Sequence, residues 1–563
     1  MKEEAAIGID LGTSNSCVAT VVDGRPRVMS NAYGERTTAS VIAFAEDGSV
    51  SVGNRARAQV ILDPTHTVSS AKRLIGRFMF SEEARKASAI ARYQIVEGER
   101  HSVRIQIREQ QFSVPEISAL VLKEMRSVAE QELGRSLEHA VVTVPAFFND
   151  NQRQATKDAG RIAGLNVLRI LNEPTAAALA YGYGQDLRAK VAVYDLGGGT
   201  FDISILELGG DVFEVLATCG DTFLGGDDFD DRLIDMLAEE FQALHDRNVR
   251  PDPFSYEKLK QASEKAKIEL SEKESTIVDV PALCTVDGKA LGIQREITRG
   301  EFDQLVQDLC QRTFKVCDEA LQQAGLTVQD LDGMILVGGS TRMPAIREAT
   351  KGYFNREPDC SINPDEVVAL GAAIHAASLM GTETDTFLLD VTPLSLRVGI
   401  TGGLTKVLIE RNSPVPIEQT RVFTTARDFQ ESVAIQIFQG ESKAARDNTL
   451  LGEVEFSGFQ PGPRGEVKIE VTFAITTEGI LKVSAGDPVT GAQRFTSVTL
   501  SGGLSETEIE RIIRDGSDSA ATDPTDRGEP QNAPAGSKPT TPDDPRAIPL
   551  EPEDTIDAEP ASD

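Results

Sequence analysis

The residues from Tyr194 to Asp202 have the types and spacing of a turn that binds a phosphate group. They read Tyr-Asp-Leu-Gly-Gly-Gly-Thr-Phe-Asp, and apolar residues lie on both sides, which predicts a strand, a tight glycine turn and a second strand. Three consecutive glycines have no Cβ atoms, so backbone N–H groups can approach an anion closely. A lone Gly-Gly-Gly run is also compatible with a plain hairpin turn.

The polar residues of this stretch add the other groups that phosphate chemistry needs. Asp195 and Asp202 offer hard oxygen ligands to Mg²⁺ or to its water molecules, and Thr200 adds a hydroxyl group. The plan recurs near the N-terminus, where residues 7–16 read as an apolar strand, Asp-Leu-Gly and hydroxyl side chains. A third apolar run, Met334 to Val337, leads into Gly-Gly-Ser-Thr-Arg. We interpret the first two stretches as an internal duplication.

Two opposed phosphate turns and a third glycine turn are typical of the actin-like fold that sugar kinases share. In that fold two related α/β lobes close on a nucleotide from either side. Strand-like and helix-like segments alternate from residue 5 to about residue 385, with helices expected at 118–133, 151–163 and 228–244. No Gly-x-x-x-x-Gly-Lys-Ser/Thr motif is present, so a P-loop ATPase is excluded.

Four motifs together resemble signatures of the seventy-kilodalton heat-shock chaperones, most closely of the bacterial DnaK type. They are Ile7 to Ser16, Asn172 to Ala178, Tyr194 to Asp202, and Ile335 to Pro344. The resemblance covers roughly residues 5 to 515. It implies an actin-like two-lobed ATPase domain (1–384), a linker (385–390), a β-sandwich substrate-binding domain (391–502), a residual lid helix (503–515) and a disordered tail (516–563).

The resemblance implies an ATP-dependent molecular chaperone with a part in the stress response. Such a protein binds short apolar segments of unfolded polypeptides and couples their binding and release to ATP hydrolysis. A small-molecule kinase of the sugar type is the alternative, and a non-hydrolysing structural relative is a third hypothesis. Sugar kinases have no β-sandwich after the second lobe, and the retained charged residues of the phosphate turns disfavour the structural relative.

Five residues match catalytic positions of the family: Lys72, Glu173, Asp195, Thr200 and Asp202. Lys72 could be an ordinary solvated lysine, but the match makes it the lysine that meets the γ-phosphate and positions the attacking water. Glu173 precedes Pro174, so capping of a helix is the alternative to orienting water or metal. The match implies that Asp202 orients water and that Thr200 contacts the γ-phosphate and is autophosphorylated.

The resemblance also implies which residues bind the nucleotide and its cations. Glu264, Lys267 and Ser271 match adenosine contacts on a charged helix, 257–270, although a solvated surface helix has the same pattern. Arg342 matches an arginine that stacks on adenine. The implied cofactors are ATP or ADP, K⁺, and Mg²⁺ held by Asp10, Asp195 and Asp202. The other implied nucleotide contacts are Gly12, Thr13, Ser14, Asn15, Gly197, Gly198, Gly199, Gly338, Gly339, Ser340 and Asp365.

A short apolar segment bracketed by acids, Asp385 to Asp390, would read by itself as a buried edge strand. Its match to the interdomain linker of the family implies that it docks on the ATPase domain with ATP bound and is released with ADP. Arg169 matches a contact with a J-domain partner. The implied coupling residues are Pro145, Arg153, Arg169, Leu388, Leu389 and Asp390.

From Val391 onward the sequence changes to short alternating runs divided by Gly, Pro and Asn, which predicts an all-β sandwich. Periodicity does not separate a groove from the core of such a domain. The resemblance implies a peptide groove with an arch formed by Thr401 and Ala426. The implied groove residues are Val398, Ile400, Thr401, Phe423, Ala426, Val433 and Ile435.

The C-terminal region predicts one helix followed by a tail. Residues 505–515 read as a helix with Ser505 as N-cap, Glu508 completing a capping box and Gly516 as the stop. Residues 516–563 hold nine prolines and twelve acids against three bases, a composition that cannot bury a core. We therefore expect a disordered tail and a missing helical lid.

Composition limits the partners and the compartment. Lys and Arg number 57 against 88 Asp and Glu, a net charge of −31 without a basic block, which argues against nucleic acid and anionic membranes as partners. Six cysteines without CxxC spacing indicate a reducing compartment, and no signal segment is recognisable, so we expect a cytoplasmic protein. The expected partners are unfolded or extended apolar peptides, a J-domain co-chaperone and, from the exposed loop at 271–298, a GrpE-type exchange factor.

Overall fold

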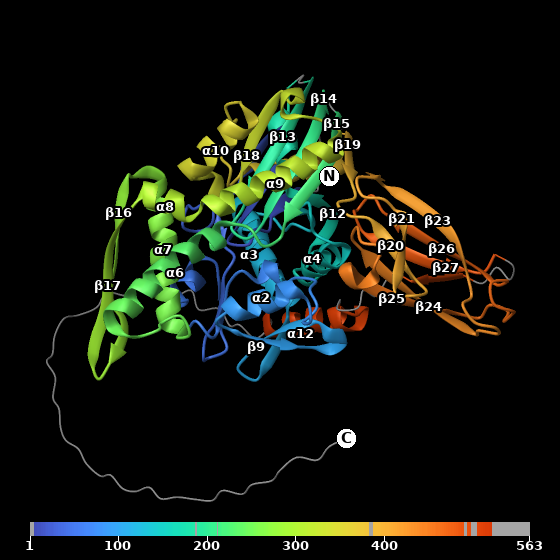
Figure 1. The fold of residues 1–563 in the computed structure, drawn as a ribbon, viewed down its shortest axis with the longest axis horizontal. Coiled ribbons are helices and arrows are strands. Elements are labelled where there is room, and N and C mark those ends of the chain that lie inside the picture. Colours follow the sequence, from blue (N-terminus) through green and yellow to red (C-terminus); the bar gives the residue numbers. More distant parts are fainter. Residues whose placement is uncertain are drawn as a thin grey trace, which may run out of the picture. The chain divides into compact units, whose positions relative to one another are not determined.

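Two sheets of matching design carry the turns that the sequence predicts (Figure 1). The computed structural model describes residues 5–185, 188–210, 212–381, 387–488, 493–496 and 504–520. The first sheet contains β1 (Ala6–Asp10), β2 (Asn15–Val22), β3 (Arg25–Val28), β4 (Thr38–Ala39), β11 (His139–Val144) and β12 (Asn166–Asn172). Its strand order is β12-β11-β1-β2-β3, with β4 paired to β2.

The second sheet repeats the central part of the first. It contains β13 (Arg188–Leu196), β14 (Phe201–Gly209), β15 (Val212–Asp221), β18 (Gly333–Val337), β19 (Phe387–Val391) and β22 (Pro414–Val415), in the order β18-β13-β14-β15-β19-β22. Both β1–β2 and β13–β14 are antiparallel hairpins, and each first strand also pairs with a parallel neighbour, β11 or β18. The predicted strand–turn–strand units are confirmed, and their equivalent places agree with an internal duplication. We call the parts built on these two sheets the first and the second lobe.

Helices cover the sheets of both lobes. They are α1 (Asn54–Gln59), α2 (Glu82–Ile90), α3 (Val114–Leu133), α4 (Asp150–Ile162), α5 (Glu173–Gly182), α6 (Gly226–His245), α7 (Pro253–Glu272), α8 (Arg299–Leu305), α9 (Gln307–Ala324), α10 (Pro344–Phe354) and α11 (Val367–Leu379). Helix α3 begins four residues before the predicted Ser118. Its start is fixed by Ser113, whose hydroxyl accepts the N–H of Glu116 while the Glu116 carboxylate accepts the N–H of Ser113.

Smaller elements complete the two lobes. Two three-stranded sheets consist of β5 (Ile42–Phe44), β6 (Val50–Val52) and β7 (Thr67–Val68), and of β8 (Gln94–Glu97), β9 (Val103–Ile107) and β10 (Gln110–Ser113). The stretch predicted as an exposed loop at 271–298 is mainly a hairpin, β16 (Ser275–Val286) and β17 (Lys289–Thr298), which Figure 1 shows beside α6, α7 and α8. Its β-branched residues and alternating burial favour paired strands over an irregular loop.

The apolar segment predicted as a linker is a strand over its described part. Strand β19 pairs in parallel with β15, with Leu388 opposite Phe213, and then antiparallel with β22. Residues 382–386 lie outside the described part of the chain. The local sequence favoured an edge strand and the family resemblance a docked linker, and a strand added to the second sheet has the pairing that both interpretations require.

After β19, two four-stranded sheets enclose a separate apolar core. One has the order β21-β20-β24-β25 and the other β23-β26-β27-β28, as expected for the predicted sandwich. The bounds are β20 (Leu396–Ile400), β21 (Leu404–Ile409), β23 (Ile417–Thr424), β24 (Ser432–Gln439), β25 (Thr449–Ser457), β26 (Lys468–Ile475), β27 (Leu481–Gly486) and β28 (Gln493–Thr496). Phe456 and Phe473 are among the residues of its core.

The last described helix, α12 (Glu506–Ala520), begins as predicted but ends later. Ser505 and Glu508 form the expected capping box, since each accepts the backbone N–H of the other. Gly516 does not stop the helix, because a glycine inside a helix costs only about 1 kcal/mol relative to alanine. Ile509 is buried in the core of the first lobe. The predicted tail from residue 521 onward lies outside the described residues.

Across the ranges that the structure describes, no helix is both long and apolar enough to cross a membrane.

Helices α5 and α11 approach each other at Gly371 more closely than any side chain permits. A Cβ atom at Gly371 would lie 1.7 Å from the backbone oxygen of Ala176. We predict that Gly371→Ala lowers the free energy of unfolding by about 1–3 kcal/mol, because the two backbones must separate. The midpoint of urea unfolding measures this loss.

Gly352 is the matched control, since it is an exposed glycine inside α10 where an added Cβ atom would have no neighbouring atom within 4 Å. Gly352→Ala should raise stability by about 0.5–1 kcal/mol through the gain in helix propensity. Equal effects of the two changes would show that the close approach of α5 and α11 carries no special constraint.

Candidate functional site

A cavity of about 540 Å³ lies between the two lobes. This volume is within the range of about 300–1,000 Å³ that is usual for small-molecule sites. The residues that line it come from the β1–β2 and β13–β14 turns, the turn after β18, and helices α6 and α7. From the predicted nucleotide contacts they include Asp10, Gly12, Thr13, Ser14, Asn15, Gly197, Gly198, Glu264, Lys267, Ser271, Gly338, Gly339, Ser340, Arg342 and Asp365.

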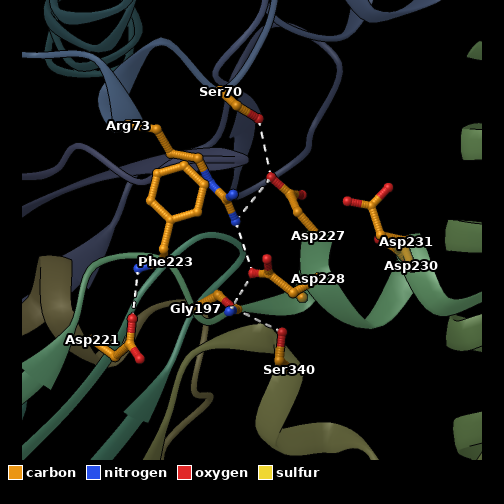
Figure 2. A network of polar contacts seen from close by, with 12 residues as sticks. Ser70, Arg73, Gly197, Asp221, Phe223, Asp227, Asp228, Asp230, Asp231 and Ser340 are labelled. Carbon is orange, nitrogen blue, oxygen red and sulfur yellow. Dashed lines mark hydrogen bonds and ion pairs between the residues drawn. The ribbon is translucent and has the colours of Figure 1, made fainter. Parts of the chain in front are cut away.

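The two hairpin turns face each other, with the side chain of Ser14 against Gly198. A Cβ atom on Gly198 would lie 2.0 Å from the Oγ atom of Ser14, so a larger residue would require the Ser14 side chain to move. The turn after β18 holds the second hairpin turn in place, because Ser340 donates its hydroxyl to the carbonyl of Gly197 at 2.9 Å (Figure 2). Backbone N–H groups at such a turn are suited to bind an anion between the lobes.

Buried carboxylates surround the floor of the cavity. Burial, followed by the neighbouring charge of Glu173, raises the pKa of Asp10 to about 7 and that of Asp202 to about 7. The same two causes hold the pKa of Asp195 well above its ordinary value. These carboxylates lack sufficient positive charge nearby, so a cation bound among them would be strongly favoured.

The predicted metal ligands do not form a complete metal site by themselves. Within the described ranges, no three His, Cys, Asp or Glu side chains are grouped closely enough to hold a metal ion. Mg²⁺ in phosphate sites keeps several water molecules and is bound through one or two carboxylates together with phosphate oxygens. The arrangement of Asp10, Asp195 and Asp202 is compatible with that kind of binding and not with a three-carboxylate cage.

Lys72 is the basic side chain of the cavity floor. It is buried, and its Nζ lies 2.5 Å from Oε1 of Glu173 at the start of α5. The side chain also lies over the ring of Phe148, with Nζ 5.7 Å from the centroid. The solvated-lysine interpretation is therefore wrong, and Lys72 and Glu173 are held as a buried pair of opposite charge that faces the two turns.

One face of α7 and the turn after β18 form the outer end of the cavity. Lys267 donates to Asp230 at 2.7 Å and to the carbonyl of Gly226 at 3.0 Å, which ties α7 to α6. Arg342 donates to Asp365 at 2.7 Å, so its guanidinium is held at the rim. The interpretation as a solvated surface helix is thus wrong for the side of α7 that carries Glu264, Lys267 and Ser271, since all three line the cavity.

Two predicted residues lie beside the cavity instead of lining it. Gly199 is the buried last glycine of the second turn and packs close to Arg73 and Thr13. Asp202 is buried and accepts the backbone N–H of Phe147 at 3.0 Å. Thr200 lines the cavity as predicted. Asp227 and Asp230 also line it and were missed. The Gly-Gly-Asp-Asp run at 225–228 was the available signal, because glycines and acids at a helix start are typical of a ligand-binding turn.

A continuous series of hydrogen bonds runs from the cavity floor to β19. Behind Asp202, Arg153 donates to the carbonyls of Phe148 at 3.1 Å and Ala146 at 2.9 Å, and to the side-chain oxygen of Asn172 at 2.7 Å. The amide nitrogen of Asn172 donates to both carboxylate oxygens of Asp390 at 2.9 Å. Strand β19 is therefore joined through Asp390, Asn172 and Arg153 to the residues beside Asp202.

The structure brings the predicted coupling residues together and adds one. The carbonyl of Pro145 accepts the N–H of Phe148 at 3.1 Å, so Pro145 begins the turn that Arg153 holds. Arg169 donates to His375 at 3.3 Å and is near Asp390, whose charge partly offsets the burial of Arg169. Asn172, which begins the motif Asn172 to Ala178, was not among the predicted coupling residues, and its side chain lies between Arg153 and Asp390.

The predicted groove residues divide between core and surface of the sandwich. Val398 and Ile435 are 2% and 7% exposed and belong to the sandwich core. Phe423 and Val433 are half-buried against the same core. Ile400, Thr401 and Ala426 are exposed. In this conformation the two core residues are not open to a peptide.

The comparison with protein families agrees with this architecture. The model of the Hsp70 family, described as Hsp70 protein, matches residues 6–537. Members of that family are ATPases and chaperones that bind ATP or ADP with Mg²⁺, unfolded peptides and co-chaperones. The fold is that of an actin-like ATPase domain followed by a β-rich domain, as the sequence predicts. The match spans nearly all of the chain, which therefore belongs to the Hsp70 family.

Proposed function

We propose that this chain is an ATP-driven chaperone that binds short apolar segments of unfolded polypeptides and couples their binding and release to ATP hydrolysis. The observation that carries the proposal is the series of hydrogen bonds that runs from Asp202 through the Ala146–Phe147 peptide group, Arg153 and Asn172 to Asp390. It joins a buried carboxylate beside the cavity to the strand that precedes the sandwich. A change at the cavity floor can thereby bias the docking of β19.

The proposed roles of the cavity residues follow from their chemistry. Lys72 places a positive charge at the γ-phosphate, and Glu173 holds that lysine in place. Asp202 orients water, which requires no strong base in phosphoryl transfer. The Ser14 and Gly198 turns bind the phosphates through backbone N–H groups. Thr200 contacts the γ-phosphate and is the proposed site of autophosphorylation.

The residues present fit a nucleotide with a divalent cation. Mg²⁺, when bound, neutralises the charge of the β- and γ-phosphates, and Asp10, Asp195 and Asp202 would hold it, in part through water. Burial first and the charge of Glu173 second raise the pKa values of Asp10 and Asp202 to about 7 each, and a bound cation would oppose both effects. Glu264, Lys267, Ser271 and Arg342 would bind the adenosine, and K⁺ is a further proposed cation.

The sandwich is the proposed peptide-binding part. Its two sheets follow the second lobe directly through β19. Exposed apolar side chains near the predicted groove include Ile400, Leu404, Val422 and Phe429. Since the proposed groove residues Val398 and Ile435 are covered here, peptide access requires the sandwich to open. Sugar kinases have no β-sandwich after the second lobe, so the sandwich of this chain disfavours the kinase alternative.

The proposal also includes the co-chaperones, the subtype, the cellular role and location, and the domain boundaries. A J-domain co-chaperone would contact Arg169, and a GrpE-type exchange factor would contact the β16–β17 hairpin. The DnaK subtype, a role in the stress response and a cytoplasmic location belong to the same interpretation. The proposed domain boundaries are those of the resemblance for 1–384, 385–390 and 391–502, whereas the residual lid helix ends at Ala520 and the tail begins at residue 521.

One measurement tests the function as a whole. ATP turnover of the full chain is measured alone, with an apolar peptide, and with the peptide and a J-domain protein. We expect slow basal turnover that the peptide and the J-domain protein both stimulate. Turnover that depends on an added sugar and yields a sugar phosphate would establish the kinase instead.

Loss of either γ-phosphate contact should affect hydrolysis far more than binding. We predict that Lys72→Ala and Thr200→Ala each slow single-turnover ATP hydrolysis on the order of 10²- to 10³-fold, because a preorganised transition-state contact is removed. ATP affinity, measured by calorimetry, should change much less. Hydrolysis close to the wild-type rate in both variants would contradict the assignment.

The two leucines of β19 give a matched pair for testing the coupling. Leu388 is 9% exposed and packs in an apolar core of the lobes, whereas its neighbour Leu389 is 43% exposed. We predict that Leu388→Asp abolishes stimulation of ATP turnover by peptide, because a buried carboxylate cancels docking of the strand. Basal turnover should remain.

Leu389→Asp is the control, since its carboxylate would stay in water on the exposed face of β19. It should keep most of the stimulation by peptide. If both variants respond to peptide like the wild type, β19 is a structural strand and not a coupling segment.

A further inference from the structure

Arg73, the residue after Lys72 in the first lobe, contacts the start of α6 in the second lobe through its side chain (Figure 2). Arg73 follows Lys72 in a short 3-10 turn at Ala71–Arg73. Its Nη2 atom donates to Oδ2 of Asp228 at 3.0 Å and lies 3.6 Å from Oδ2 of Asp227. Ser70, just before the turn, donates its hydroxyl to Asp227 at 3.2 Å. The Lys72 turn is thus attached at both ends to the first turn of α6.

The first turn of α6 also holds the glycine turn of the second lobe. The N–H of Gly226 donates to the carbonyl of Gly197 at 2.9 Å, and the N–H of Asp227 donates to that of Gly198 at 2.8 Å. Oδ2 of Asp228, which accepts from Arg73, also accepts the N–H of Gly225 at 2.8 Å. The start of α6 therefore connects Lys72 and the glycine turn, which come from different lobes.

The surroundings of Arg73 are specific for a guanidinium group. The side chain is 2% exposed, and its Cζ lies 4.7 Å from the centroid of the Phe223 ring, which covers one face (Figure 2). Its Nε has no hydrogen-bond partner among the described residues and lies 2.8 Å from where a Cβ on Gly199 would be. A lysine would keep the charge but lose the planar fork and the stacking on the ring.

The two carboxylates beside Arg73 differ in their electrostatics, since burial raises the pKa of Asp228 despite the nearby charge of Arg73. Burial opposes ionisation of Asp227, but the positive charges of Arg73, Lys260 and Lys267 prevail and keep its pKa below the ordinary value. A buried pair of this kind fixes geometry, because removal of one partner leaves the other charge without compensation.

We infer that Arg73 is a positioning residue for ATP hydrolysis, which fixes Lys72 relative to the Gly197–Gly199 turn across the cleft. The inference rests on the proposed function, since the role of Lys72 at the γ-phosphate is part of it. Arg73 acts through Lys72 and does not itself line the cavity between the lobes. It sets the distance between two phosphate-binding groups that no covalent segment connects directly.

A second contact crosses the same cleft and provides the control. Arg92, between α2 and β8, lies with its Cζ 3.6 Å from the centroid of the Tyr256 ring on α7. This contact joins the lobes but does not involve the Lys72 turn. Comparing Arg73→Lys with Arg92→Lys therefore separates positioning of Lys72 from simple closure of the cleft.

The first test is single-turnover hydrolysis at saturating ATP. We expect Arg73→Lys and Asp228→Asn to slow hydrolysis about 10- to 100-fold, because a displacement of about 1 Å can cost on the order of 10² in rate. The Kd for ATP should change little, and Arg92→Lys should hydrolyse ATP at the wild-type rate. A double variant, Lys72→Ala with Arg73→Lys, should be no slower than Lys72→Ala alone.

The second test needs no nucleotide. Amide hydrogen exchange of the free protein reports on the Lys72 turn through the N–H groups of Leu74 and Ile75, which donate to Ala71 and Lys72. We expect these amides to exchange faster in Arg73→Lys than in the wild type and to be unchanged in Arg92→Lys. Equal exchange in all three proteins overturns the inference.

The two tests separate the inference from the proposed function. If Lys72→Ala is slow but Arg73→Lys equals the wild type, the proposed function stands and the role of Arg73 is wrong. If the losses of Lys72→Ala and Arg73→Lys multiply in the double variant, Arg73 acts independently and is not a positioning residue. If the wild type and Lys72→Ala hydrolyse ATP equally slowly, the proposed function fails, and hydrogen exchange alone decides whether Arg73 orders the turn.

Discussion

Buried negative charge is the constraint on which the cleft between the lobes depends. Asp10, Asp195, Asp202 and Glu173 lie together beneath the two glycine turns, and Lys72 is the basic side chain that faces them. Burial and mutual repulsion make the ionised forms of the three aspartates costly, as their raised pKa values show. Either protonation or a bound cation would lower this electrostatic cost.

The chemistry of the cleft could be predicted from the sequence because it is local. Each phosphate turn consists of glycines, acids and hydroxyl side chains that lie within a few residues of one another at the end of a strand. The structure places these turns face to face. The contacts that join the turns could not be predicted in this way. Asn172, Asp227 and Asp228 are polar residues of ordinary type whose partners are distant in the chain, so only the tertiary fold brings Arg153 or Arg73 to them.

The helix starts and the sandwich likewise combine features that the local sequence predicts with features that depend on tertiary contacts. The capping boxes at Ser113 and Ser505 fix two helix starts, but only the start at Ser505 was predicted. In the sandwich, alternation identifies inward-facing residues but not whether a core or a groove receives them. Val398 and Ile435 face inward into a closed core, whereas Ile400 and Thr401 follow on the surface. Whether an inward-facing residue lines a core or a groove depends on the distance between the two sheets. The sequence of a single strand does not determine that distance.

Strand β19 belongs to the second sheet by backbone pairing on only a few residues, from Phe387 opposite Val212 to Leu389 opposite Glu214. Its departure would leave the N–H and C=O groups along that part of β15 without partners and turn β15 into an open sheet edge. Such an edge is a template for any extended backbone that reaches it.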